Sequence, residues 1–145
     1  VLMHMKGRPR DMQENPEYES VVSEVTGFLR TSVARAKEYG ISGENIIIDP
    51  GIGFGKTVAH NLELLRRLKE LKSLGCPILL GTSRKSFIGR TLGLPVEDRV
   101  EGTAATIALG IASGVDIVRV HDVKYMARVA RMTDAIVRGG TSCER

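Results

Sequence analysis

The chain has 145 residues, of which 42% are hydrophobic and 26% charged, and its formal net charge is +4. This length and balance are typical of one globular domain that is large enough to bury a hydrophobic core. Aromatic residues make up only 4% of the chain and runs of like charge are short, which excludes a nucleic-acid-binding protein that works through stacked bases or a basic tail.

Four strands are expected, over residues 1–5, 45–49, 78–82 and 116–120. The second contains an unbroken run of isoleucines, a pattern typical of burial on both faces of a parallel sheet. The first strand is already under way at residue 1, so we expect the sequence to be a piece of something longer.

Helices are expected between these strands. The first is expected to start at Asn15-Pro16, because Asn suits the N-cap and Pro suits the first helical position. Gly40 supplies a left-handed stop for it. Further helices are expected over about residues 61–74, from Ser86, over about 102–113, and over about 123–138 with Asp122 as N-cap.

The alternation of strands and helices predicts parallel pairing with right-handed crossovers. Two α/β architectures fit, an open doubly wound sheet or part of a (β/α)8 TIM barrel. A complete barrel takes roughly 250 residues, so the four βα units would supply about half of one. We expect residues 1–140 to form this unit and residues 141–145 to be a disordered tail.

Two cysteines, Cys76 beside an apolar strand and Cys143 in the polar tail, do not make a disulfide framework. Cys76 is expected to be a buried small hydrophobic side chain. No secretory signal opens the chain and no apolar stretch approaches a membrane span. The expected location is therefore a reducing cytoplasm, away from the membrane.

Polar and charged residues follow the strands at their carboxyl ends, where both architectures bind ligands. Asp49 ends the isoleucine run, and a carboxylate there is costly unless something donates a hydrogen bond to it. It is either a turn former before Pro50 or an acceptor for the N–H groups of a heterocyclic ligand. The glycine-rich loop that follows is not a P-loop, because Pro50 stands where that motif needs glycine.

Ser83-Arg84-Lys85-Ser86 opens a helix after the third strand, a place that favours an anion. Arg84 and Lys85 could be solvated surface charges, but their position at a strand end favours a function. Arg119 and His121 lie two apart on the fourth strand and so face the same way.

An arginine fork beside a histidine suits a phosphate or a diphosphate. The alternative for Arg119 is a structural ion pair with Asp122 or Asp116. His4, His60 and His121 lack the spacing of a metal site, and His4 is expected to be a hydrogen-bonded strand-end residue.

Taken in order, these segments resemble the signatures of the dihydropteroate synthase family. The resemblance runs from Val1 to about Gly140. The segments that carry it are Leu2-Met3-His4-Met5, the loop from Asp49 to Lys56, Ser83-Arg84-Lys85-Ser86 and Arg119-Val120-His121-Asp122. Each is modest alone, and as an ordered set they are specific.

The resemblance implies the C-terminal half of a TIM-barrel transferase of folate biosynthesis, which acts as a homodimer when intact. Such an enzyme joins 6-hydroxymethyl-7,8-dihydropterin diphosphate to p-aminobenzoate with Mg²⁺ and releases diphosphate. Sulfonamide drugs compete for its p-aminobenzoate site. The family's first four strands, and the Asn expected to bind the metal, are absent from this sequence, so no metal ligand is assigned and an incomplete active site is expected.

The resemblance also implies a role for eight residues of this chain. Asp49 would hold the pterin, Met3 would pack against its ring, and Lys85 would contact it and help close the site. Arg119 and His121 would bind the diphosphate. Ser86 would take the p-aminobenzoate carboxylate in a pocket lined by Gly53 and Phe54. Lys85, Arg119 and His121 would be the catalytic residues.

Two other readings stay open. A pterin-binding methyltransferase domain of the same barrel superfamily would share the pterin-holding Asp49 but would not need the Arg119–His121 pair or the Ser-Arg-Lys-Ser helix start. A non-catalytic half-barrel would bind phosphate only, or would serve as an assembly piece, and would form defined oligomers without turnover.

Overall fold

The computed structural model of the chain describes residues 1–8, 10, 12 and 14–139. The expected disordered tail, residues 141–145, lies outside them. The elements in chain order are β1 (Leu2–Met3), α1 (Val21–Glu38), the 3₁₀ helix η1 (Gly43–Asn45), β2 (Ile48–Asp49), α2 (Val58–Arg66), the 3₁₀ helix η2 (Leu68–Leu74), β3 (Leu79–Leu80), α3 (Ser86–Leu92), the 3₁₀ helix η3 (Val96–Asp98), α4 (Val100–Ala112), β4 (Ile117–Val118) and α5 (Val123–Arg138).

The strands pair in the order in which they occur in the sequence. β1 pairs in parallel with β2, β3 pairs in parallel with β4, and a parallel bridge between Ile48 and Ile78 joins the two pairs. A doubly wound sheet reverses its strand order at a switch point, whereas a barrel does not. The uninterrupted order therefore agrees with four βα units of a (β/α)8 barrel and argues against the doubly wound alternative.

Each strand is shorter than expected, because regular pairing holds over only two residues in each. Backbone hydrogen bonds extend the alignment past these limits. The His4 N–H donates to the Asp49 carbonyl at 3.0 Å, and the Arg119 N–H donates to the Leu80 carbonyl at 2.9 Å. The residues that follow the strands are therefore held in register with their neighbours even where they are not counted as strand.

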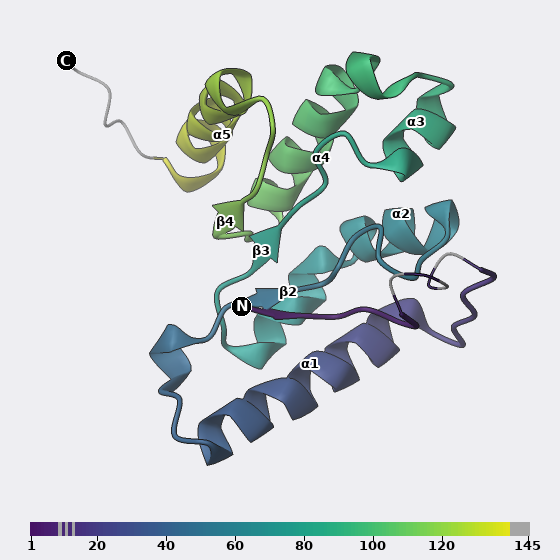
Figure 1. Cartoon of the computed structure of the whole chain (residues 1–145). Helices are drawn as coiled ribbons and strands as arrows, with labels where there is room; N and C mark the ends of the chain where they lie inside the picture. The colour runs from purple at the N-terminus through teal and green to yellow at the C-terminus, as the bar shows by residue number, and fades with distance from the viewer. Residues whose placement is uncertain (9, 11, 13, 140–145) are drawn as a thin grey trace.

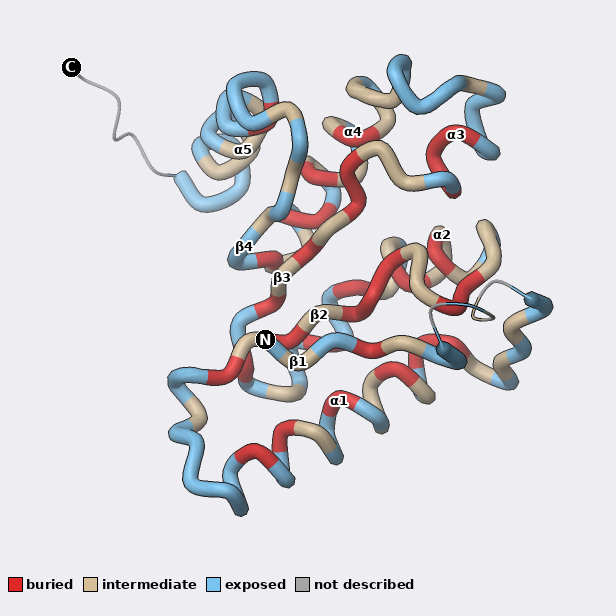
Figure 2. The backbone as a smooth tube through the Cα atoms, in the orientation of Figure 1, coloured by how far each residue is buried: buried red, intermediate tan, exposed pale blue. Residues whose placement is uncertain are grey.

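The strands form a row between α1 at one end and α5 at the other (Figure 1). Buried residues follow the strands and the inward faces of the helices (Figure 2). One hydrophobic cluster joins α1, the strands and η2, and includes Leu29, Ile48 and Leu80, which are fully buried. A smaller cluster of Ile107, Ile111 and Met126 holds α4 against α5. Cys76 is buried, as expected from the sequence.

The first helix begins later than predicted. Its N-cap is Ser20, whose hydroxyl accepts a hydrogen bond from the Ser23 N–H. The Glu24 carboxylate accepts from the N–H groups of Glu19 and Ser20. These acceptors satisfy the N–H groups of Glu19, Ser20 and Ser23 at the start of the helix. The helix therefore starts at Val21 and not at Asn15-Pro16, where Asn15 adopts a left-handed conformation with φ of 46°.

The helix predicted over residues 61–74 is also different in the structure. It begins earlier, because the Thr57 hydroxyl and the His60 ring form a reciprocal capping box. It then changes at Arg67 from α to 3₁₀ geometry, and Gly75 ends it in the left-handed conformation at φ of 68°. Leu68 and Leu71 are fully buried in this last part, so the predicted apolar face is retained.

We expect Ser20→Ala to lower the free energy of unfolding by about 1 kcal/mol, since it removes the N-cap acceptor of α1. Thr31→Ala, at an exposed position inside the same helix, should instead raise stability by a few tenths of a kcal/mol, on the order of the difference in helix propensity. Urea unfolding followed by circular dichroism distinguishes the two. Equal effects of both substitutions would mean that Ser20 is not the cap.

Candidate functional site

A cavity of about 200 Å³ lies where the strands end. Its lining residues lie at the ends of the four strands or in the loops that follow them. They are Met3, Asp49, Phe54, Gly81, Ser83, Lys85, Arg119, Val120 and His121. Six of the eight residues predicted to form the site are therefore brought together at one place. In the sequence, the first and last of them, Met3 and His121, are more than a hundred positions apart.

Gly53 and Ser86 are the two predicted residues that do not line this cavity. Gly53 lies next to it, because a Cβ atom at this position would be 3.0 Å from Cδ of Lys85. Ser86 is the first residue of α3 and is exposed. The hydroxyl of Ser86 thus stands at the start of the helix that follows Lys85, outside the cavity.

Asp49 ends β2 with a half-buried carboxylate. Its Oδ1 accepts a hydrogen bond of 2.7 Å from the Gly51 N–H, while Oδ2 accepts none from the described residues. Burial raises the pKa of this carboxyl group, and the Gly51 hydrogen bond and the nearby cations of Lys85, Lys56 and Arg119 act in the opposite direction. Asp49 therefore forms the predicted turn and also keeps one oxygen available as an acceptor.

Lys85 crosses the cavity to the glycine-rich loop. Its ammonium group donates to the Ile52 carbonyl and lies 4.5 Å from the centre of the Phe54 ring, a cation–π distance. Burial lowers the pKa of Lys85 to about 8; Asp49 opposes this shift and Arg119 adds to it. The contacts hold the loop of residues 50–55 and the loop after β3 together across the cavity.

Arg119 and His121 follow β4, and both side chains are exposed at the cavity. The structural ion pair considered for Arg119 is not formed. Asp122 is bound to Arg84, and Asp116 is bound to Lys72 and to a backbone N–H. Within the described residues, the Arg119 side chain makes no hydrogen bond or ion pair, so its planar fork is available to a ligand.

The sequence favoured a ligand-binding role for Arg84, but in the structure its side chain is bound to Asp122. Its guanidinium group binds both carboxylate oxygens of Asp122, at 2.9 and 2.6 Å. Its backbone carbonyl accepts a hydrogen bond of 2.9 Å from Arg99, and its φ of 56° is left-handed. Arg84 therefore connects the loop after β3 to the residue before α5, and Asp122 is bound to it rather than capping α5 with its side chain.

Lys56 is a residue that the sequence analysis did not single out. It is 4% exposed, and its Nζ lies 2.9 Å from Nδ1 of His4, 2.9 Å from the Gly51 carbonyl and 3.0 Å from the Phe54 carbonyl. An ammonium group has three donors, and all three are satisfied here. Burial lowers the pKa of Lys56 to about 7. This lysine holds the glycine-rich loop against the end of β1.

A sequence signal for this role exists in retrospect. A loop with several glycines in the left-handed conformation leaves carbonyl groups without helix or sheet partners. The lysine that ends such a loop, close behind a buried strand, is a natural donor for them. The prediction that His4 is a hydrogen-bonded strand-end residue agrees with its contact to Lys56.

His4 should make the stability of the fold dependent on pH. Burial, with a further contribution from the Lys56 cation, lowers the pKa of His4 from 6.5 to about 4. The unfolded chain therefore binds a proton between pH 6.5 and 4 that the folded chain does not. Stability from this group is complete above pH 6.5 and is lost as the pH falls, by about 3 kcal/mol in all.

Urea unfolding at pH 7 and at pH 4.5, compared between the unmodified chain and His4→Asn, measures this contribution. Asparagine retains an acceptor near Nζ of Lys56 but does not titrate. The carboxylates are present in both proteins, so the difference between them in the change of unfolding free energy from pH 7 to pH 4.5 reports His4 together with its contact to Lys56. An equal change in unfolding free energy between the two pH values in both proteins would contradict the lowered pKa of His4.

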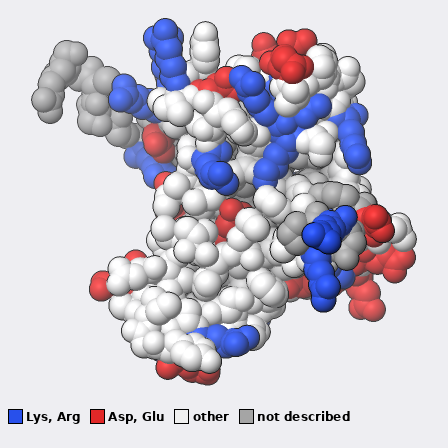
Figure 3. All heavy atoms as spheres, viewed as in Figure 1, with Lys and Arg blue, Asp and Glu red and all other residues white. Residues whose placement is uncertain are grey.

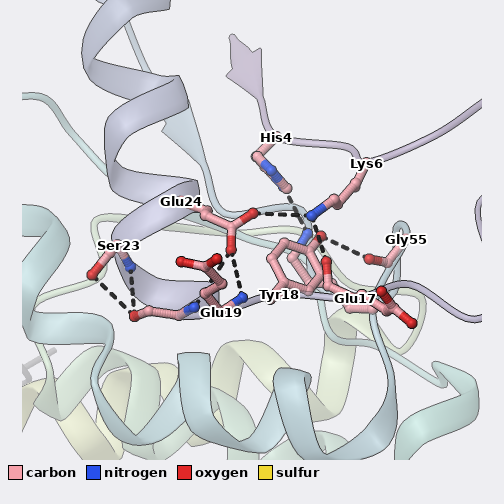
Figure 4. Close-up of polar contacts among 10 residues, drawn as sticks. His4, Lys6, Glu17, Tyr18, Glu19, Ser23, Glu24 and Gly55 are labelled. Carbon is pink, nitrogen blue, oxygen red and sulfur yellow. Dashed lines mark hydrogen bonds and ion pairs between the residues drawn. The ribbon is translucent and has the colours of Figure 1, made fainter.

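A second hollow, of about 750 Å³, lies beside the N-terminus of α1 and is lined by residues that include Lys6, Tyr18, Glu24 and His60. The lysine that lines this hollow, Lys6, is already paired with a carboxylate. Lys6 Nζ is 3.0 Å from the Glu24 carboxylate, donates to the Glu17 carbonyl and lies 4.2 Å from the Tyr18 ring centre. Figure 4 shows Lys6 between these residues. Among the described residues that line this hollow, no cation is therefore left free for an anion, in contrast to the strand-end cavity.

The described residues contain no group of three or more His, Cys, Asp or Glu side chains that could hold a metal ion. Among the same residues, no helix has the length and apolar character needed to cross a membrane.

Several Lys and Arg side chains lie on the half of the molecule formed by α3, α4 and α5 (Figure 3), the half that also supplies Arg119 and His121. The cavity that Lys85, Arg119 and His121 line is therefore suited to an anion.

Comparison with known proteins agrees with this picture. The family model for pterin binding enzymes matches residues 1–121. A curated dihydropteroate synthase from Synechocystis is 50% identical over 139 residues, which are 95% of this chain and 48% of that protein. One from Bacillus subtilis is 51% identical over 131 residues, 89% of this chain and 46% of that protein.

Solved structures give the same result. A Yersinia pestis dihydropteroate synthase with a sulfonamide drug superposes with a TM-score of 0.93 at 37% identity, over 96% of this chain and 51% of that one. A Thermus thermophilus dihydropteroate synthase in complex with 4-aminobenzoate superposes with a TM-score of 0.86 at 40% identity, over 92% and 55%; the same enzyme has been solved in complex with 6HMPPP.

The chain spans about half the length of the curated relatives it matches. The predicted fold, half of a TIM barrel made of four βα units, is confirmed by these structures, and the resemblance to dihydropteroate synthases is confirmed by the identities. With the family model matching most of its length, the chain belongs to the family of pterin binding enzymes.

Proposed function

We propose that the chain supplies half of the active site of a dihydropteroate synthase. The observation that carries this proposal is the strand-end cavity. It combines the Asp49 carboxylate, one oxygen of which accepts no hydrogen bond from the described residues, with the ring of His121 and the guanidinium group of Arg119, which has no partner among the same residues. A pterin diphosphate presents the complementary groups, N–H donors at one end and an anion at the other. The complexes of the relatives with 4-aminobenzoate and 6HMPPP support the choice of substrates.

In this proposal the residues act on three parts of the substrates. Asp49 accepts hydrogen bonds from the amino-pyrimidine edge of the pterin, while Met3 packs on the ring and Lys85 contacts it. Arg119 and His121 bind the diphosphate. The p-aminobenzoate carboxylate would be bound at Ser86, with Gly53 and Phe54 beside its ring, which places this subsite at the edge of the cavity because Ser86 lies outside it.

The reaction is a displacement at the exocyclic methylene carbon of the pterin. The C–O bond to diphosphate breaks with both electrons going to the leaving oxygen, the amine nitrogen of p-aminobenzoate forms the new C–N bond, and the nitrogen loses a proton. Arg119 and His121 stabilise the charge of the departing diphosphate, and the other residues orient the reactants. No covalent intermediate with the enzyme is required.

The family resemblance implies Mg²⁺, but the described residues do not form a site for it. The only cavity carboxylate, Asp49, lies near three cations, and no further carboxylate joins it among the described residues that line the cavity. Its ligand is therefore expected in the rest of the barrel, and no step is assigned to it here. The proposal also includes a cytoplasmic location, a homodimeric assembly of the intact enzyme and no nucleic-acid partner.

The test is dihydropteroate formation by the purified 145-residue chain, given dihydropterin diphosphate, p-aminobenzoate and Mg²⁺, with and without a separately expressed N-terminal half of a related enzyme. We expect activity only when the second half is added, since among the described residues β1 and β4 each pair with one neighbour and need further strands to close a barrel. No activity together with no binding of the pterin diphosphate would exclude the proposed function, and stronger binding of methyltetrahydrofolate would favour a methyltransferase.

A further inference from the structure

Ser83 contacts His121 at the wall of the cavity, and neither the family resemblance nor the proposed mechanism assigns Ser83 a role. It is 5% exposed. Its Oγ accepts the backbone N–H of His121 at 3.1 Å and lies 2.9 Å from Nδ1 of the same residue. A single hydroxyl group therefore holds both the backbone and the ring of His121, from a loop 38 positions away in the sequence.

The protons of this contact can be assigned. A serine hydroxyl has one hydrogen and two lone pairs. One lone pair of Ser83 is occupied by the His121 backbone N–H, and within the described residues Nδ1 of His121 is the only acceptor for the hydroxyl hydrogen. If Nδ1 carried the proton instead, the buried hydroxyl hydrogen would have no acceptor among the described residues, which costs on the order of 1–3 kcal/mol.

The hydroxyl hydrogen thus goes to Nδ1, and in the neutral imidazole the ring proton must be on Nε2. Nε2 makes no hydrogen bond with the described residues, and the exposed ring of His121 lines the cavity together with Arg119. An Nε2–H group in this position is a donor that complements the guanidinium fork, and both can bind the oxygens of one anion.

We propose that Ser83 is a positioning residue that fixes neutral His121 as its Nε2–H tautomer and so presents an N–H donor to an oxyanion, such as diphosphate, bound beside Arg119. The tautomer follows from the contacts of Ser83 alone. Only the identity of the anion rests on the proposed function.

The tautomer is measured directly by long-range ¹H–¹⁵N correlation spectra of the ¹⁵N-labelled chain at alkaline pH, where imidazole is neutral. The three histidines are assigned with His4→Asn, His60→Gln and His121→Gln variants. We expect His121 to show a protonated Nε2 and an unprotonated Nδ1. A protonated Nδ1, or an even mixture, in the unmodified chain overturns the proposal without any need for a variant.

Ser83→Ala should convert His121 to a mixture of tautomers and weaken the binding of inorganic pyrophosphate, measured by calorimetry, by about tenfold. Ser83→Thr retains the hydroxyl and should restore both, whereas Ser73→Ala removes an exposed hydroxyl elsewhere and should change neither. An unchanged tautomer in Ser83→Ala would contradict the role of Ser83. Absence of pyrophosphate binding by the unmodified chain, with the Nε2–H tautomer present, would count against the proposed function and not against the tautomer.

Discussion

Replacing Gly51 with alanine is expected to lower the free energy of unfolding by about 3 kcal/mol or more. A Cβ atom at Gly51 would lie 1.8 Å from the carbonyl oxygen of His4 and 2.9 Å from its carbonyl carbon. These are backbone atoms at the end of β1, so they cannot move aside as a flexible side chain could. Overpacking of this kind costs about 1–3 kcal/mol, and the left-handed φ of 66° adds about 1–2 kcal/mol for any residue with a Cβ.

Gly75→Ala is the matched control. Gly75 has nearly the same backbone conformation, with φ of 68°, but a Cβ there would meet nothing within 4 Å. Its expected cost is therefore the conformational part alone, about 1–2 kcal/mol. Urea unfolding of the two variants separates close approach from backbone strain, and equal losses would show that the glycine-rich loop is not held against β1 as described.

The same substitution should also change the site. Gly51 donates to Asp49 and accepts from Lys56, so a shift of its backbone moves the acceptor at the end of β2 and the loop that carries Phe54. We expect weaker pterin binding in Gly51→Ala even under conditions in which the variant remains folded. Gly75→Ala, at the end of η2, should bind as the unmodified chain does.

The residues that meet at the strand-end cavity could be predicted from the sequence, because parallel strands align their carboxyl ends. Once the strands were located, Met3, Asp49, Lys85, Arg119 and His121 had to approach one another whatever the exact lengths of the helices. The local periodicity that locates a strand therefore also predicts a long-range arrangement.

The partners of individual side chains could not be predicted in this way. Arg84 and Arg119 are both arginines at strand ends, and nothing in their local sequence shows that one binds Asp122 while the other makes no ion pair. The difference depends on the left-handed backbone of Arg84, which directs the following chain. Lys56 was missed for a related reason, since its acceptors are loop carbonyls whose positions depend on the folded backbone.

The start of α1 shows a third limit. Asn15 and Pro16 match the usual residues of a helix start, but Ser20 and Glu24 compete for the same role five residues later. Capping preferences are each worth about 1 kcal/mol, so two candidates in succession cannot be ranked by residue type. The choice is made by the packing of Val21 and Val25, which are buried in the core.

Arg119→Ala is expected to weaken pyrophosphate binding by the chain roughly ten- to a hundredfold, the usual effect of losing a charged hydrogen-bond donor. Arg119 has no ion-pair partner among the described residues, so its removal leaves no internal group unsatisfied and should change stability little. When the active site is completed with the second half, turnover should fall on the order of a hundredfold, because the charge on the leaving diphosphate loses its main donor.

Lys6→Ala provides the control for this prediction. It removes the same charge, but Lys6 is paired with Glu24 and lines the other hollow. Its loss should therefore change pyrophosphate affinity and turnover less than about twofold, as expected for an exposed, paired charge outside the cavity. A similar decrease in both variants would mean that the anion responds only to the overall positive charge of the chain, and it would remove Arg119 from the proposed site. A large loss confined to Arg119→Ala would instead require a specific contact at the end of β4, and this contact is the part of the proposed function that depends most directly on the arrangement of the strands.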